Sequence, residues 1–185
     1  MALTTAQIAT LKADIAANSD TNSQPMSNAG HAEIARLYNL ASTTDVWRTD
    51  APVSGIADAI NWAAYTPTDT PDGTALYTNR ALVIQTKQMN LQMMLQGRTT
   101  VDASRANIRA GLRDAVTGLP AGASGAVVVA GGANGITVLT ALTRKALRIE
   151  KLFMGATATT GPVTANLLVY EGGIAADEVA TARES

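Results

Sequence analysis

Apolar residues recur at intervals of three and four positions along most of the chain, which is typical of amphipathic helices. Near the start, Ile8, Leu11 and Ile15 fall on one helical face. The longest segment without glycine or proline runs from 74 to 96, which predicts a long, rigid helix. Helices are predicted at residues 6–18, 30–41, 52–65, 74–96, 102–117, 136–153 and 174–185.

Two segments have a different pattern. TTDVWR (43–48) favours a short extended piece, and PVTANLLVYEG (162–172) has the β-branched, apolar residues typical of a strand. The predicted fold class is therefore mainly α, a helical domain with one long central helix over 74–96, a glycine-rich loop or arm, and a small β element near the C-terminus.

The segment AGASGAVVVAGGANG (121–135) interrupts the helical pattern with small, apolar residues. It predicts a flexible interaction loop that orders on contact with a partner. We therefore expect a helical body at 1–120, the loop at 121–135, and a C-terminal helix–strand–helix segment at 136–185 packed on the same single domain. The residues expected to carry the loop's contacts are Gly125, Val127, Val128, Val129, Gly131, Gly132 and Gly135.

Part of this loop, VVVAGGANGI (127–136), also resembles the glycine turn with which short-chain dehydrogenases approach a pyrophosphate. Glu150 lies near the position expected to bind the ribose. However, Thr137 stands where that family has another glycine, and Ile174 stands where a lysine should follow Tyr170. A nucleotide-dependent enzyme is thus an alternative, and the interaction loop is the preferred interpretation.

The amino-acid composition limits the kinds of functional site that the chain can form. There is no cysteine, which excludes disulfides, Cys-ligated metals and thiol nucleophiles, and His31 is the only histidine. We therefore expect no catalytic, cofactor-binding or metal-binding residues, and no enzyme. No apolar run approaches the roughly 20 residues that cross a bilayer, so we expect no membrane contact. Met89, Met93 and Met94 are interpreted as filling gaps in the core.

Charged residues are unevenly distributed along the chain, although its formal net charge is only −1. Residues 1–72 and 152–185 are acidic, whereas residues 73–151 are basic. This pattern favours contacts between copies of the chain, and the alternative is neutralisation within one monomer. Two predicted helices carry basic rows at spacings of three and four, which are expected to contact another subunit or a DNA channel, or else to face solvent: Arg105, Arg109, Arg113, Arg144, Arg148 and Lys151.

Several stretches resemble a family of small virion proteins of tailed bacteriophages. They are ALTTAQIATLKADIAAN, VWRTDAPV, INWAAYTPTD, VYEGGIAADEVATAR and, as the longest, DGTALYTNRALVIQTKQMNLQMMLQGRTTVDASRANIRAGLRDAVTGLPAG. Such proteins look like head–tail connector components, also called adaptors or head-completion proteins. Members of that class are helical and form rings below the portal around the channel through which DNA leaves.

The resemblance implies a structural virion protein that is made in the bacterial host cytoplasm. Its expected partners are a ring of about 12 copies of itself, the portal protein, a tail or tail-completion protein, and passing double-stranded DNA bound without sequence specificity. Alternatives are another minor virion protein, such as a tail-completion or minor capsid protein, and a nucleic-acid-binding module that uses Arg105, Arg109 and Arg113.

Overall fold

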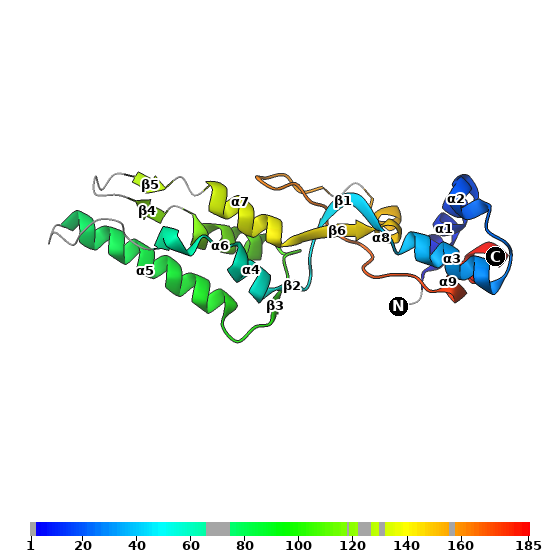
Figure 1. The fold of residues 1–185 in the computed structure, drawn as a ribbon, viewed down its shortest axis with the longest axis horizontal. Coiled ribbons are helices and arrows are strands. Elements are labelled where there is room, and N and C mark those ends of the chain that lie inside the picture. Colours follow the sequence, from blue (N-terminus) through cyan, green and yellow to red (C-terminus); the bar gives the residue numbers. More distant parts are fainter. Residues whose placement is uncertain (1–2, 66–74, 118, 122–126, 130–131, 156–157) are drawn as a thin grey trace. The chain divides into compact units, whose positions relative to one another are not determined.

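The two ends of the chain contribute to one packing unit, and most of the middle forms another (Figure 1). The computed structural model describes residues 3–65, 75–117, 119–121, 127–129, 132–155 and 158–185. Unit 1 comprises Met1–Val46, Lys145–Thr159 and Thr164–Ser185, and unit 2 comprises Trp47–Arg144 and Thr160–Val163. These boundaries do not coincide with the expected ones at 120 and 135.

More than half of the described residues are helical, which confirms the mainly α fold class. Unit 1 contains five helices in its described part: α1 (Thr5–Ala17), α2 (Ser19–Asn22), α3 (Asn28–Tyr38), α8 (Arg148–Phe153) and α9 (Ala176–Glu184). The described part of unit 2 contains α4 (Val53–Ala59), the 3-10 helix η1 (Trp62–Tyr65), α5 (Ala75–Leu95), α6 (Ala106–Val116) and α7 (Gly132–Ala141).

Short strands form three two-stranded sheets among the described residues. The pairs are β1 (Ala41–Trp47) with β6 (Thr143–Leu147), β2 (Ala51–Pro52) antiparallel to β3 (Thr100–Val101), and β4 (Leu119–Ala121) antiparallel to β5 (Val127–Val129).

The strand predicted at 162–172 is wrong. This segment makes only isolated bridges at Asn166, to Val46 and to Ala158. The backbone next to Asn166 is held by a local hydrogen bond instead, in which the Thr159 N–H donates to the Ala165 carbonyl at 3.0 Å. The β structure therefore does not lie near the C-terminus as expected.

Side-chain caps decide where the first helices begin. The Thr4 hydroxyl accepts the N–H of Gln7, and the Gln7 side chain accepts the N–H of Thr4, which forms a capping box at the start of α1. Ser27 caps α3 by accepting the N–H of Gly30 at 3.3 Å. Because of this cap, α3 starts at Asn28 rather than at residue 30, and it ends at Tyr38 rather than near 41.

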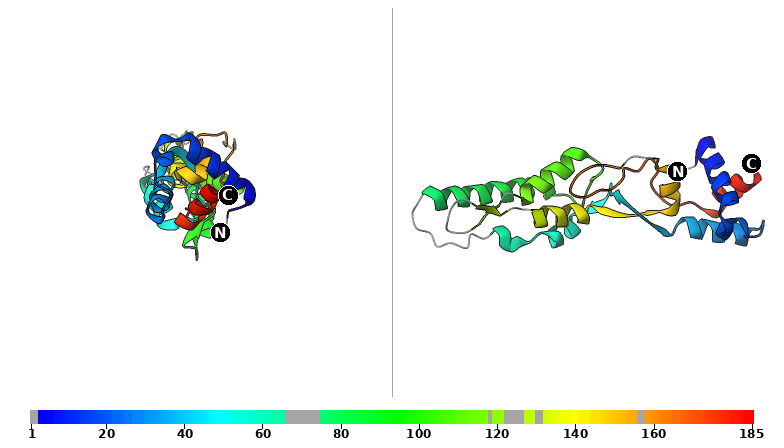
Figure 2. Two further views of the ribbon diagram at one scale, coloured as in Figure 1. Left: turned by 90° about the vertical axis from the view of Figure 1, so that its right-hand side faces the viewer. Right: turned by 90° about the horizontal axis from the view of Figure 1, so that it is seen from above.

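Unit 1 has a core to which both chain ends contribute. Leu11 and Ile15 of α1, as the spacing predicted, are buried together with Ile34 of α3 and Val179 of α9. Helix α9 contacts both α1 and α3 (Figure 1 and Figure 2). Burial of apolar surface is the main favourable contribution to folding, so the C-terminal helix is an integral part of this unit.

Glu150 is a fully buried carboxylate in the same unit. Its Oε2 accepts the N–H of Leu147 at 2.8 Å, and its Oε1 accepts the N–H of Gly172 at 2.9 Å. Both oxygens therefore bind backbone groups of this unit, one at the start of α8 and one in the segment before α9. The ribose-binding role considered for Glu150 does not agree with this arrangement.

The single helix predicted at 136–153 is wrong, because α7, β6 and α8 replace it. Helix α7 ends where the Leu142 N–H donates to the Leu139 carbonyl at 3.1 Å, and the Leu142 carbonyl accepts the N–H of Arg48 at 2.9 Å. The following residues pair with β1. Helical periodicity in the sequence continues through this segment, but pairing with a distant strand overrides it.

The glycine-rich segment is also more regular than predicted. Val127, Val128 and Val129 form β5, and Gly132 and Gly135 belong to α7, whereas Gly125 and Gly131 lie outside the described residues. A Cβ atom on Gly135 would lie 2.6 Å from Thr117 Cγ2, beside the end of α6. Gly135 therefore permits close packing of α7 on α6, rather than loop flexibility or a phosphate turn.

We predict that Glu150→Ala lowers the free energy of unfolding by about 2–5 kcal/mol, because two partly buried N–H groups lose a charged acceptor. Glu150→Gln keeps one acceptor oxygen, so its free energy of unfolding should fall by less. Urea unfolding measures the effect, and Glu184→Ala, on the exposed end of α9, is the matched control. Equal stability of Glu150→Ala and the control would contradict the structural role of this carboxylate.

We predict that Gly135→Ala destabilises unit 2 by about 1 kcal/mol, within a range of about 0–2 kcal/mol. Overpacking against Thr117 costs about 1–3 kcal/mol, and the better helix propensity of alanine offsets about 1 kcal/mol. Gly55→Ala in α4 is the control, since its Cβ would meet only Pro52 Cγ at 3.4 Å. If thermal unfolding ranks the Gly135→Ala variant as the more stable, the close contact is wrong.

Candidate functional site

The row of Arg105, Arg109 and Arg113 does not form the uniform stripe that the sequence predicted. Helix α6 begins at Ala106 rather than at residue 102, so Arg105 lies before it, and Asp102 accepts the N–H and the hydroxyl of Ser104. The Arg105 Nε atom is 2.9 Å from Asp102 Oδ2. These hydrogen bonds, with that from the Ser104 hydroxyl as the strongest cause, hold the pKa of Asp102 below its ordinary value.

Arg109 has a structural role within unit 2. Its Nη1 donates to the carbonyls of Ala103 and Ser104, each at 2.7 Å, and its guanidinium lies 4.6 Å from the centroid of the Trp47 ring. Partial burial lowers the pKa of this guanidinium from its usual value. Arg113 remains exposed on α6. Two of the three arginines are thus engaged by their own unit.

Arg144, Arg148 and Lys151 do not share one helix. Arg144 lies in β6, Arg148 is the first residue of α8, and Lys151 follows within α8. The Arg148 Nη1 atom is 2.8 Å from Asp20 Oδ2, and its guanidinium lies 5.6 Å from the centroid of the Tyr38 ring.

Lys145, beside that row, is paired as well, with its Nζ 2.9 Å from Asp45 Oδ2. Both this pair and that between Arg148 and Asp20 join the basic middle of the sequence to its acidic N-terminal block, and both lie inside unit 1. The alternative of neutralisation within one chain is confirmed for these two pairs. Contact of the basic rows with another subunit stays a prediction.

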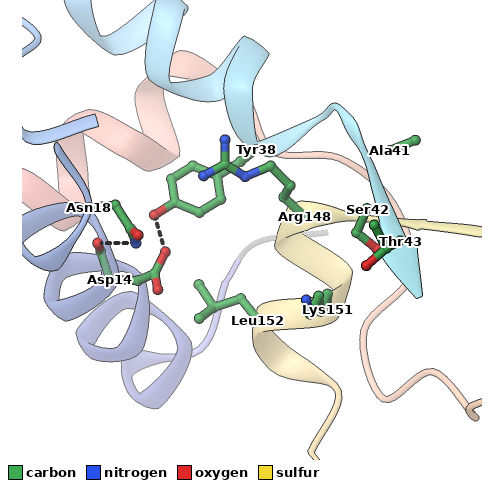
Figure 3. A pocket seen from close by; sticks show the side chains of 9 residues that line it. All are labelled: Asp14, Asn18, Tyr38, Ala41, Ser42, Thr43, Arg148, Lys151 and Leu152. Atoms are coloured by element: carbon green, nitrogen blue, oxygen red, sulfur yellow. Dashed lines mark hydrogen bonds between the residues drawn. The ribbon is translucent and has the colours of Figure 1, made fainter. Parts of the chain in front are cut away.

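A pocket of about 550 Å³ lies in unit 1 (Figure 3). In it, the Tyr38 hydroxyl donates to Asp14 Oδ2 at 2.5 Å, and the Asn18 amide donates to the Asp14 carbonyl at 2.8 Å. Burial, and then the bond to Asp14, raise the pKa of Tyr38 above its usual value, so this phenol remains a donor. The bond from Tyr38 joins the ends of α1 and α3, and the bond from Asn18 closes the end of α1, so both have a structural role. The pocket is lined by Asp14, Asn18, Tyr38, Ala41, Ser42, Thr43, Arg148, Lys151 and Leu152.

Helix α5 carries the most exposed apolar surface described in unit 2. Its inner side is buried at Ile84 and Leu91, each 3% exposed. On the opposite side, Leu82, Met89 and Met93 are 54%, 61% and 70% exposed. With Thr86 between them, they follow the four–three–four spacing of one helical face. We call Leu82, Thr86, Met89 and Met93 the outer face of α5.

The outer face of α5 is also free of charge. Every exposed side chain that the structure describes on this helix is uncharged. Lys87 is partly buried and turned away, with its Nζ donating to the Asp114 carbonyl of α6 at 2.5 Å. Most surface helices present charged residues to water. An uncharged apolar face on a rigid helix is typical of a contact with another protein.

Sequence reasoning missed this surface. The interpretation of the methionines as core filling is wrong for Met89 and Met93, which are exposed, and it holds only for Met94, whose terminal methyl group packs on Gly111 of α6. A signal was present, because α5 has two apolar stripes on opposite sides. A helix with apolar residues on both sides needs two partners.

The described residues contain no group of three or more acidic or histidine side chains that could hold a metal ion. They also include no helix with both the length and the apolar character needed to span a bilayer.

The pair of Arg148 and Asp20 predicts a pH-dependent coupling. The hydrogen bond from Arg148 is the main cause that lowers the pKa of Asp20. The pKa of Asp20 is lower in the folded state than in the unfolded state. The pair therefore stabilises the folded state at pH values above the usual pKa of aspartate, and this stabilisation is lost as the pH falls through the folded-state pKa. A double-mutant cycle with Asp20→Asn and Arg148→Met should give a coupling free energy of about 0.5 kcal/mol at neutral pH, as for exposed pairs.

This coupling should disappear between about pH 5 and about pH 2, as Asp20 becomes protonated. Urea unfolding of the four variants across this range measures it. A coupling that persists undiminished at the acidic end would contradict the assignment of the pair.

Comparisons of the chain with protein-family models, with curated proteins and with solved structures each return no match. The function is therefore argued from the surfaces of this chain and from the sequence stretches quoted above.

Proposed function

We propose that this chain is a structural protein of a tailed-phage particle, a head–tail adaptor that assembles with copies of itself into a ring between portal and tail. The observation that carries the proposal is the outer face of α5. Burying a Leu or Met side chain contributes about 1.5–3 kcal/mol, so Leu82, Met89 and Met93 together supply a substantial driving force for association.

The phage context of the proposal comes from the sequence. The stretch from 72 to 122, which contains α5 and α6, is the longest of those that resemble head–tail connector proteins. In that class, the partners are the portal, a tail or tail-completion protein, and passing double-stranded DNA. A rigid helix with one covered and one exposed apolar side suits a subunit that packs against neighbours in a ring.

The arrangement of charges supports a channel that does not hold DNA tightly. The whole chain carries −1, and Arg105, Arg109, Arg148 and Lys145 are engaged within their own units. A protein that grips DNA neutralises many phosphates with available lysines and arginines. These engaged side chains favour the adaptor over a nucleic-acid-binding module built on the α6 arginines.

A rival of the same class, a tail-completion or minor capsid protein, would use the same assembly surface. The position of the protein in the virion separates the two, because an adaptor lies directly below the portal. Density for this chain in cryo-EM images of the particle decides between them.

We predict that the double variant Met89→Glu with Met93→Glu assembles at least tenfold more weakly than the wild type. The new carboxylates would have to lose water in an apolar contact without a partner charge. Sedimentation velocity over a range of concentrations measures this, and circular dichroism verifies that the helices remain. Gln92→Glu, exposed on the same helix but off the outer face, is the control and should assemble like the wild type.

A wild-type protein that stays monomeric at every concentration and is absent from virions would overturn the proposed function.

A further inference from the structure

The proposed assembly raises the question of what covers the outer face of α5. A second surface of the same kind lies on α7, which is also part of unit 2. Val138 and Leu139 turn inward and are buried, whereas Ile136 is 45% exposed, and Thr137 and Thr140 are exposed on the same side. We call Ile136, Thr137 and Thr140 the outer face of α7. The helix contains no charged residue.

The two outer faces match in their polar groups. On α5, the Thr86 hydroxyl donates to the Leu82 carbonyl at 2.8 Å, and on α7 the Thr140 hydroxyl donates to the Ile136 carbonyl, also at 2.8 Å. Both hydroxyl groups are therefore satisfied by their own helix. Contact between the faces would leave neither of these donors buried without an acceptor, so it avoids the cost of unmade hydrogen bonds.

The faces also match in charge and in size. Neither presents a charged side chain among the described residues, so no ion has to be desolvated and no like charges meet. The long side chains of Leu82, Met89 and Met93 stand on α5, whereas α7 offers one isoleucine beside two shorter threonines. Large side chains on one surface against small ones on the other allow interdigitation, which two α5 faces with identical long side chains do not offer each other.

The placement of the two helices suits a ring. Helix α6 contacts both, and α5 and α7 run along different sides of it (Figure 1). One subunit therefore presents two distinct, complementary surfaces. Contacts between different surfaces of identical subunits are heterologous, and they close into rings when the rotation permits.

We infer that the outer face of α5 packs on the outer face of α7 in the next copy of the chain. This inference rests on the proposed self-assembly and names its contact. A helix of 10 residues is about 15 Å long, so this contact buries less than the about 800 Å² per partner of a stable complex. Isolated pairs should accordingly be weak, and closed rings should form cooperatively as the concentration rises.

Cysteine cross-linking tests the inference cleanly, because the chain has no cysteine of its own. We predict that a mixture of the Met89→Cys and Ile136→Cys variants, oxidised at concentrations where the wild type assembles, gives disulfide-linked pairs that join positions 89 and 136. Each variant alone should give few. Ser54→Cys, at an exposed position of α4, is the control and should not link to either. Non-reducing electrophoresis and peptide mass spectrometry identify the products.

Other results would distinguish a failure of this inference from a failure of the proposed function. Efficient linking of Met89→Cys to itself would mean that α5 pairs with α5, which overturns the inference and leaves self-assembly standing. Assembly without any link between positions 89 and 136 would overturn it as well. As a second variant, Ile136→Glu should weaken assembly at least tenfold, and assembly equal to that of the wild type would contradict the role of α7.

Discussion

Close packing of α6 against α5 and α7 is the constraint on which the rest of unit 2 depends. Gly135 lets Thr117 come near, where a larger residue would collide, and Gly111 leaves room for the end of the Met94 side chain. Each flanking helix therefore turns its inner side fully toward α6. The opposite sides of both helices stay exposed, and their apolar, uncharged character makes them suited to contacts with other molecules rather than with water.

Unit 1 is organised on a different principle, in which polar groups join segments that are far apart in sequence. The buried Glu150 carboxylate bonds the start of α8 and the backbone at Gly172, and Arg148 pairs with Asp20. Much of the charge that was expected to act between molecules is used here within one chain. Unit 2 also pairs charges within itself, at Arg105 and Lys87, and its α5 and α7 present the uncharged outer faces used in the proposed assembly.

The candidate site could be predicted from the sequence only in part. The basic residues stand out in the sequence, but their roles depend on neighbours that the sequence does not reveal. Arg109 lies over Trp47, and it binds carbonyl groups that local spacing cannot place. The spacing shows both apolar stripes of α5, one with Ile84 and Leu91 and the other with Leu82, Met89 and Met93. It does not show which of the two stripes the chain itself covers.

Local sequence determined the mainly helical character, the buried face of α1, and the start of that helix to within one residue, because caps and periodicity act over a few positions. The tertiary structure alone decided that residues 143–147 leave the helical pattern to pair with β1, that the valines at 127–129 form a strand, and that Met89 and Met93 remain exposed. These outcomes depend on contacts between segments distant in sequence. Such contacts compete with local propensity, and a pattern of apolar residues does not state which neighbour will cover them.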